Sequence, residues 1–211
     1  MKNVETKRFD ESVVIPQFAI YNPKLNMRLF IAIEIPGEIK QKMADVQRRL
    51  RDTAVDAGWT RPEGIHLTLK FLGEITESKV PDIMGTLTRA LGGTGGFRLE
   101  IERVGTFPSP KNARVVWVGV SGDVERLMNL QTAVEDAMAE LGMERDDRLF
   151  TPHLTLGRIK YLRSKEKWLN ILEEIKNIKL AGFDVKAVAL MMSELRRTGA
   201  VYSEMGRIEL K

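Results

Sequence analysis

Cysteine is absent from this chain of 211 residues, and histidine occurs only twice. Without cysteine the chain can form neither a disulfide nor a thiolate metal site, and it offers no nucleophilic thiol. The chain also lacks an apolar run long enough to cross a bilayer, so we expect no membrane insertion. These absences fit a protein of the reducing cytoplasm.

The charge balance is only mildly basic. Lysine and arginine number 33 against 29 for aspartate and glutamate, a formal net charge of +4, and 43% of the residues are apolar. This composition is typical of a globular protein, and its small positive excess favours an acidic partner locally. Residues 1–26 carry charges from the start, and Pro16 interrupts their short apolar run, so they lack the continuous apolar region of a signal peptide. We expect the chain to remain in the cytoplasm.

From Met27 onward the apolar spacing predicts alternating strands and helices. The spacing of Ile39, Met43, Val46 and Leu50, for example, is that of one helix face. The expected strands are residues 28–35, 65–75, 97–107, 113–120, 151–159, 183–195 and 200–210, and the expected helices are 36–54, 78–91, 123–141 and 164–178.

Both histidines occur in the same tetrapeptide, HLTL, which begins at His66 and again at His153. An apolar strand precedes each tetrapeptide, and the distance from Phe30 to His66 equals that from Trp117 to His153, at 36 residues. Agreement in order and spacing predicts a duplicated strand, helix and strand unit. We expect one domain over 27–211 with lobes of about 27–110 and 111–211, between which strands can be exchanged.

Each tetrapeptide can present one imidazole and one hydroxyl on the same face of a strand. Successive side chains alternate, so His66 and Thr68 share one face while the leucines share the other, and His153 and Thr155 repeat the arrangement. Imidazole titrates near neutrality, so one histidine can act as an acid and the other as a base. Two such groups suit in-line displacement at phosphorus.

Two other interpretations compete with this one. A histidine on a strand is commonly a buried structural residue, but that interpretation leaves the paired threonines and the matching upstream strands as coincidences. A metal site needs three or four ligands, and no carboxylate stands at a suitable spacing from the two histidines. We therefore expect neither a metal nor another cofactor.

With these motifs the chain resembles the 2H phosphoesterase superfamily, and within it the RNA 2',3'-cyclic phosphodiesterases, also called 2'-5' RNA ligases. The resemblance rests on MRLFIAIEIP, IHLTLKFLGE, ARVVWVGV, RLFTPHLTLGR, LMMSEL and GAVY, in that order. It implies an α+β fold of two lobes related by a pseudo-two-fold axis. In that fold two antiparallel sheets backed by helices surround a V-shaped cleft.

The resemblance also implies an activity and roles for residues. The implied reaction is metal-free hydrolysis of an RNA 2',3'-cyclic phosphate to a 2'-phosphate, with reversible 2'-5' joining of RNA ends, such as tRNA halves, in some members. His66 corresponds to the proton donor and His153 to the proton acceptor, while Thr68 and Thr155 correspond to phosphate contacts. We expect a monomer.

Cations and aromatic rings near the motifs are candidates for RNA contacts. Arginine binds phosphate in a bidentate manner, and aromatic side chains stack on unpaired bases. Strict alternation places Arg158 on the opposite face of its strand, although twist or a bulge near the strand end can return it to the groove. Solvated charge is the alternative for the arginines, and a core role is the alternative for Phe30. The candidates are Arg158, Arg148, Arg114, Phe150, Phe30 and Lys70.

Three matters stay open from the sequence. The substrate could instead be 2'-5' oligoadenylate or a small cyclic nucleotide, which would make activity less sensitive to salt than with RNA. A module that binds RNA ends without turnover is the non-enzymatic alternative. Residues 1–26 precede the point where the resemblance begins, and they are a candidate added strand, a disordered tail or a consequence of the chosen start codon.

Overall fold

The computed structural model describes residues 26–53, 55–196 and 199–211. The expectation about the N-terminal extension therefore lies almost entirely outside the described residues. Four helices and nine strands follow one another along the described chain, with short 3-10 turns η1 (Pro62–Gly64), η2 (Glu77–Lys79) and η3 (Pro110–Asn112). No helix in the described part is long and apolar enough to span a membrane.

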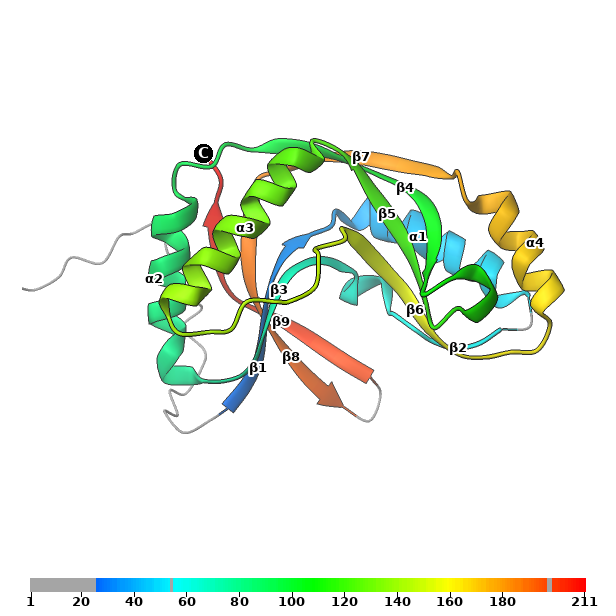
Figure 1. The fold of residues 1–211 in the computed structure, drawn as a ribbon, viewed down its shortest axis with the longest axis horizontal. Helices are drawn as coiled ribbons and strands as arrows, with labels where there is room; N and C mark the ends of the chain where they lie inside the picture. The colour runs from blue at the N-terminus through cyan, green and yellow to red at the C-terminus, as the bar shows by residue number, and fades with distance from the viewer. Residues whose placement is uncertain (1–25, 54, 197–198) are drawn as a thin grey trace, which may run out of the picture.

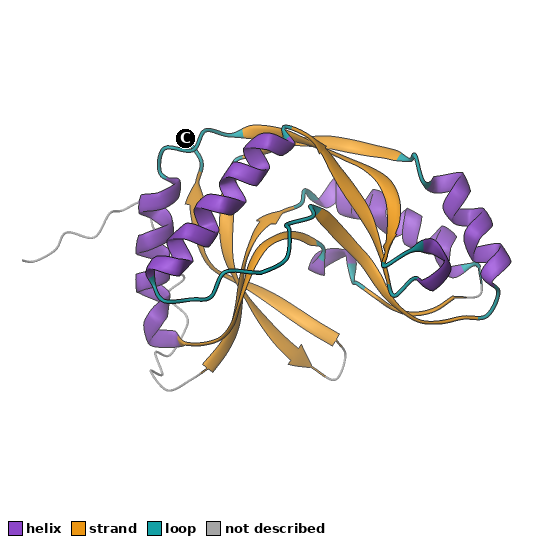
Figure 2. Cartoon of the chain, viewed as in Figure 1, coloured by secondary structure: helices purple, strands orange, loops and turns teal. Residues whose placement is uncertain are grey.

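The strands form two antiparallel sheets, as predicted (Figures 1 and 2). The four-stranded sheet has the order β3 (His66–Thr76), β1 (Asn26–Glu34), β8 (Ala187–Arg196), β9 (Gly199–Glu209). The five-stranded sheet has the order β2 (Val55–Trp59), β6 (His153–Leu162), β5 (Val115–Gly122), β4 (Phe97–Phe107), β7 (Lys179–Val185). The expected single strand 183–195 is thus two strands, because the chain crosses between the sheets at Lys186. Strand β2 was not predicted.

The two halves of the sequence exchange elements. Strand β4, from the first half, pairs with β5, while β8, from the second half, pairs with β1. Helix α1 (Gly37–Arg51) follows β1 yet contacts β2 and β7 of the other sheet, and α3 (Val124–Glu140) follows β5 yet contacts β3. The sheets are therefore composite, and neither corresponds to one half of the chain.

The helices form a pair against each sheet. Figure 1 shows α2 (Val80–Leu91) beside α3 at one end of the molecule and α1 near α4 (Lys165–Ile175) at the other. The predicted face of α1 is buried, with Ile39, Met43, Val46 and Leu50 each at most 3% exposed. On α3 the buried positions include Leu127, Leu130 and Val134, whereas Val124 and Met128 are only partly buried.

Buried side chains form two clusters. The larger lies between the sheets and their helices and includes the motif leucines Leu67 and Leu154. The smaller lies on the opposite face of the four-stranded sheet and consists of Phe30, Ala32, Ala189 and Met191, with Tyr202 packed against it. Burial of such side chains contributes about 1.5–3 kcal/mol for each large residue. Phe30, a member of the second cluster, packs against the imidazole of His66.

Candidate active site

The two HLTL tetrapeptides open strands β3 and β6, and their side chains alternate as predicted. The leucines at positions 67, 69, 154 and 156 are buried, whereas His66, Thr68, His153 and Thr155 are partly exposed. Strands β3 and β6 belong to different sheets, and they contact each other. We call the surfaces that carry the histidines and threonines the motif faces.

Each imidazole hydrogen-bonds the backbone two residues upstream. The Nδ1 atom of His153 lies 2.7 Å from the carbonyl oxygen of Thr151, and the His66 ring bonds the backbone of Gly64. A carbonyl oxygen only accepts, so Nδ1 of neutral His153 carries the proton and Nε2 is the free acceptor. The duplicated tetrapeptide thus holds its two rings in the same local way.

Aromatic rings flank both histidines. The ring of Phe30 lies 4.5 Å from that of His66, and Tyr202 of β9 meets His66 edge-on at 5.0 Å. On the other sheet the ring of Phe107 meets His153 edge-on at 5.1 Å. A Cβ atom at Gly64 would come within 2.8 Å of the Tyr202 ring, so this close packing requires the absence of a side chain there.

The environment of His66 disfavours its charged form. Burial, and then the nearby Lys40 ammonium, lower the pKa of His66 from 6.5 to about 4, while the bond to Gly64 and the carboxylate of Glu34 act in the opposite direction. The free protein therefore carries neutral His66 at pH 7. Burial raises the pKa of the Tyr202 phenol, and the Arg158 guanidinium lowers it.

A β-bulge follows the third residue of each motif. Across β1 and β3, Ala32 pairs with Thr68 and Ile31 with Lys70, which leaves Leu69 without a partner. Across β5 and β6, Trp117 pairs with Thr155 and Val116 with Gly157, which leaves Leu156 without one. Each extra residue reverses the alternation beyond it. The residues five positions after the histidines consequently lie on the motif faces.

Each bulge is tied to a helix that comes from the other half of the chain. The side-chain amide of Gln47 on α1 donates to the carbonyl oxygen of Leu156 at 2.7 Å, and also to that of Thr60. The amide of Gln131 on α3 donates to the carbonyl oxygen of Leu69 at a longer 3.5 Å. The exchanged helices thus hold the bulges that shape the motif faces.

The bulges determine on which face of their strands two of the candidate residues lie. Arg158 pairs with Val115 and returns to the motif face, by the bulge and not by twist of the strand alone. Lys70, in contrast, turns into the interior, where its ammonium bonds Glu135 at 2.6 Å and the carbonyl oxygen of Glu144 at 2.8 Å. The expectation that Lys70 contacts RNA is therefore wrong, because its charge is buried and paired.

The remaining four candidates differ in how exposed their side chains are. Arg114 is exposed immediately before β5, where its carbonyl oxygen accepts from the backbone N–H of Ile159, and Arg148 is exposed before β6. Phe150 is partly buried against the main core. Phe30 is 1% exposed, so it supports His66 and offers no open face for stacking.

Two site residues escaped the sequence prediction. Phe71 is 68% exposed, its ring lies 5.9 Å from that of Phe30, and its position after His66 equals that of Arg158 after His153. That shared spacing is the signal that could have identified it. Tyr202 comes from the C-terminal strand and has no counterpart in the motif spacing. The matched spacing of Phe30 and Trp117 was misleading, since Ala32 and Trp117 are the residues opposite the threonines.

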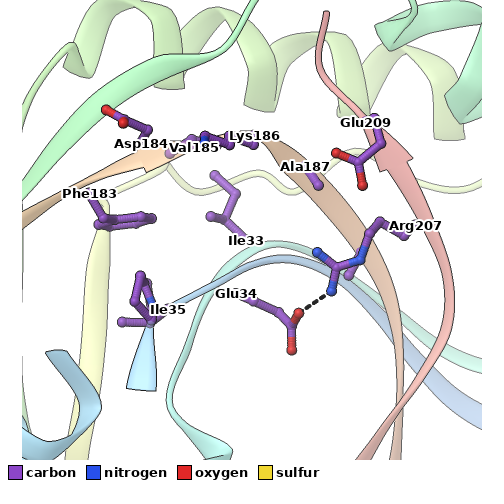
Figure 3. A pocket seen from close by; sticks show the side chains of 12 residues that line it. Ile33, Glu34, Ile35, Phe183, Asp184, Val185, Lys186, Ala187, Arg207 and Glu209 are labelled. Atoms are coloured by element: carbon purple, nitrogen blue, oxygen red, sulfur yellow. Dashed lines mark hydrogen bonds and ion pairs between the residues drawn. The ribbon is translucent and has the colours of Figure 1, made fainter. Parts of the chain in front are cut away.

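A pocket of about 430 Å³ lies on the four-stranded sheet where β7 passes into β8 (Figure 3). Glu34 and Arg207 form an ion pair in its wall, and Glu209 and Phe183 also line it. Because Glu34 is also the register partner of His66, the pocket adjoins the first motif. In the described part of the chain, no three histidine, aspartate or glutamate side chains gather as metal ligands do.

Comparison with known proteins agrees with this geometry. The LigT like Phosphoesterase family model matches residues 33–117 and again 118–202. The RNA 2',3'-cyclic phosphodiesterase of Methanothermobacter thermautotrophicus is 31% identical over 86% of this chain and 97% of its own length. That of Thermotoga maritima is 33% identical over 83% and 91%.

A solved structure shows the same duplicated fold. The crystal structure of TT0787 of Thermus thermophilus matches 87% of this chain and 98% of its own, with a TM-score of 0.73 and 27% identity. The predicted α+β architecture is thereby confirmed. With its two matched segments and its paired motifs, the chain belongs to the LigT-like phosphoesterases of the 2H superfamily.

Proposed function

We propose that the chain hydrolyses RNA ends that carry a 2',3'-cyclic phosphate and leaves a 2'-phosphate. The observation that carries the proposal is the pair of HLTL motifs on contacting strands, each with its imidazole bonded to the backbone two residues upstream. Relatives that align over nearly their whole length are named RNA 2',3'-cyclic phosphodiesterase, which supports the same reaction class.

His153 is the proton acceptor in this proposal. Its Nδ1 donates to Thr151, so Nε2 can take a proton from water as the water oxygen attacks phosphorus. His66 gives its proton to the 3' oxygen as the bond between phosphorus and that oxygen breaks. The 2' oxygen keeps the phosphate, and proton exchange with solvent restores both histidines.

His66 needs the substrate to fill this role. Its pKa of about 4 in the free protein means that it is neutral at pH 7. A phosphate anion beside the ring raises the pKa of His66, since an opposite charge favours the protonated form. Substrate binding and proton loading are therefore coupled.

Neighbouring side chains supply the other contacts. Thr68 and Thr155 share the motif faces with the histidines and are the proposed donors to the non-bridging phosphate oxygens. Arg158 is the proposed cation for the phosphate, and the exposed ring of Phe71 is the proposed stacking surface for an RNA base.

The test is incubation of metal-stripped protein with a short RNA that ends in a 2',3'-cyclic phosphate, with identification of the product's terminal phosphate. We expect a 2'-phosphate, formed equally well in EDTA. His66→Ala and His153→Ala should each lower kcat by about 10²- to 10⁴-fold, the usual contribution of a general acid or base. Activity that EDTA abolishes and a divalent ion restores would overturn the metal-free route.

Controls separate the alternatives. Each variant is first shown to be folded by circular dichroism, and Lys165→Ala, at an exposed position of α4, reports nonspecific effects of substitution. Turnover of a cyclic mononucleotide but not of RNA would identify a small cyclic nucleotide, and not RNA, as the substrate. Binding of the RNA without turnover would support the non-enzymatic alternative, a module that binds RNA ends.

A further inference from the structure

A line of alternating charges crosses the four-stranded sheet and ends at His66. Glu204 and Arg207 of β9 form an ion pair at 2.5 Å, and Arg207 also pairs with Glu34 of β1. Glu34 lies directly opposite His66 in the register of β1 and β3. The order of groups is thus carboxylate, guanidinium, carboxylate and imidazole, drawn from three strands.

Register places Glu34 close to the imidazole. Side chains directly opposite in an antiparallel pair have Cβ atoms about 4.5–5.5 Å apart. The carboxylate of Glu34 raises the pKa of His66, in opposition to burial. Figure 3 shows the same carboxylate directed at Arg207 beside the pocket, so Glu34 serves both neighbours.

Other charged groups also face His66. The Lys40 ammonium of α1 lowers the pKa of His66 and is itself held by the carbonyl oxygen of Glu63 at 3.0 Å. The Tyr202 phenol of β9 meets the ring edge-on, and the Arg158 guanidinium of β6 acts on that phenol by lowering its pKa, against the effect of burial. Glu34 is the carboxylate that acts on the imidazole against these cations.

We propose that Glu34 and Arg207 are positioning residues for His66: Glu34 stabilises the protonated imidazole across the strand pair, and Arg207 limits that stabilisation by holding the same carboxylate. The inference rests on the proposed function, because it concerns the proton that His66 delivers to the leaving oxygen. Arg207 is permanently charged, since Glu204 and Glu34 hold its pKa above the ordinary arginine value.

The two residues must therefore act on His66 in opposite directions. Glu34→Gln removes the stabilising charge and keeps the shape, so it lowers the pKa of His66. Arg207→Met removes the competing cation and releases Glu34 to the imidazole, so it raises that pKa. A purely structural role would loosen the site in both variants and would not give changes of opposite sign.

The chain suits a direct measurement because it contains only two histidines. With ¹³C-labelled histidine, NMR titration of the free protein follows both rings, and the His153→Ala variant assigns them. We expect Glu34→Gln to lower the pKa of His66 by about half a pH unit or more, and Arg207→Met to raise it by a similar amount. The His153 ring is the internal control and should not follow either change.

Glu209→Gln is the matched control variant. Glu209 lines the same pocket as Glu34, but within the described chain no ion pair joins it to Arg207. A shift at His66 in Glu209→Gln as large as in Glu34→Gln would show a general effect of net charge and overturn the inference. Equal titration of His66 in wild type, Glu34→Gln and Arg207→Met would overturn it as well.

Activity supplies a second measurement. If His66 is the donor, kcat/KM at a fixed pH above the pKa of His66 should fall in Glu34→Gln and rise in Arg207→Met, by about three-fold for each half unit of change in that pKa. The NMR titration needs no substrate. Failure to hydrolyse a cyclic phosphate would therefore count against the proposed function, whereas failure of His66 to respond counts against this inference.

Discussion

Phe71 and Arg158 occupy equivalent positions, each five residues after a motif histidine and each turned onto a motif face by a bulge at the intervening leucine. One position carries an exposed aromatic ring and the other a cation. The duplicated backbone thus presents different chemistry at its two equivalent points. A nucleotide also combines a charged phosphate, which suits the cation, with an aromatic base, which suits the ring.

Phe71→Ala should weaken RNA binding more than catalysis. Loss of a stacking surface costs about 1–3 kcal/mol per base, so we expect KM to rise roughly 5- to 150-fold with little change in kcat. The measurement is steady-state hydrolysis of a cyclic-phosphate RNA. Tyr161→Ala is the matched control, because Tyr161 is 65% exposed but lies eight residues beyond His153 on β6. Equal effects of the two variants would contradict the assignment.

Gln47→Met should disturb the second motif from a distance. The Gln47 amide is buried and donates to the carbonyl oxygens of Thr60 and Leu156; without it the Thr60 oxygen loses this donor, and the Leu156 oxygen keeps the backbone N–H of Thr60. We expect a loss of about 1–3 kcal/mol in the free energy of unfolding and a fall in kcat/KM as the bulge before Arg158 relaxes. Urea titration and kinetics measure both. Gln131→Met removes two longer bonds, to the carbonyl oxygen of Leu69 and to the Glu135 carboxylate, from a partly buried side chain, and it should cost less; a larger loss there would refute this account.

Lys70→Met should destabilise the fold, because it leaves the Glu135 carboxylate buried without its cation. The two side chains are 4% and 9% exposed, and removal of one partner of such a pair costs about 3–5 kcal/mol. The double variant Lys70→Met with Glu135→Leu should recover most of this loss. The measurement is the free energy of unfolding in urea.

The control for that pair is an exposed one of equal length. Arg89 and Glu140 also lie 2.6 Å apart, but their side chains are 66% and 58% exposed. Arg89→Met should change the free energy of unfolding by less than about 1 kcal/mol, as surface pairs do. Similar losses in Lys70→Met and Arg89→Met would show that burial is not the cause.

Acid should reveal the burial of His66 as a loss of stability. The unfolded imidazole takes up its proton near the ordinary pKa of 6.5, whereas the folded one does so only near 4. The unfolded state therefore binds more protons in this window, and the free energy of unfolding falls as the pH drops from 6.5 toward 4. His66→Gln removes that contribution.

The difference between wild type and His66→Gln is the quantity to measure. Between pH 7 and pH 4.5 we expect wild type to lose about 1–3 kcal/mol more than the variant in urea unfolding. Parallel losses in the two proteins would mean that the folded imidazole titrates normally.

Much of the fold and the centre of the site followed from local patterns. Helical spacing identified the buried face of α1, and strand alternation placed His66 and His153 opposite their leucines. These features depend on near neighbours in the chain, which the sequence displays. The sequence allows twist or a bulge near the end of the strand as a way for Arg158 to reach the motif face, and the structure has a bulge, at Leu156.

Features that depend on distant pairing could not be predicted. Lys70 continues the alternation of His66 and Thr68 in the sequence, and only the pairing of β1 with β3 shows the extra residue that reverses it. The crossing at Lys186 likewise interrupts an unbroken apolar run, because the two ends of that run join different sheets. Tyr202 reaches His66 only because β9 belongs to the same sheet as β3.

The exchange of strands has a consequence for the independence of the two halves. Residues 27–110 alone would lack β8, which pairs with β1, and residues 111–211 alone would lack β4, which pairs with β5. For the same reason, we expect neither half of the present chain to fold when expressed alone.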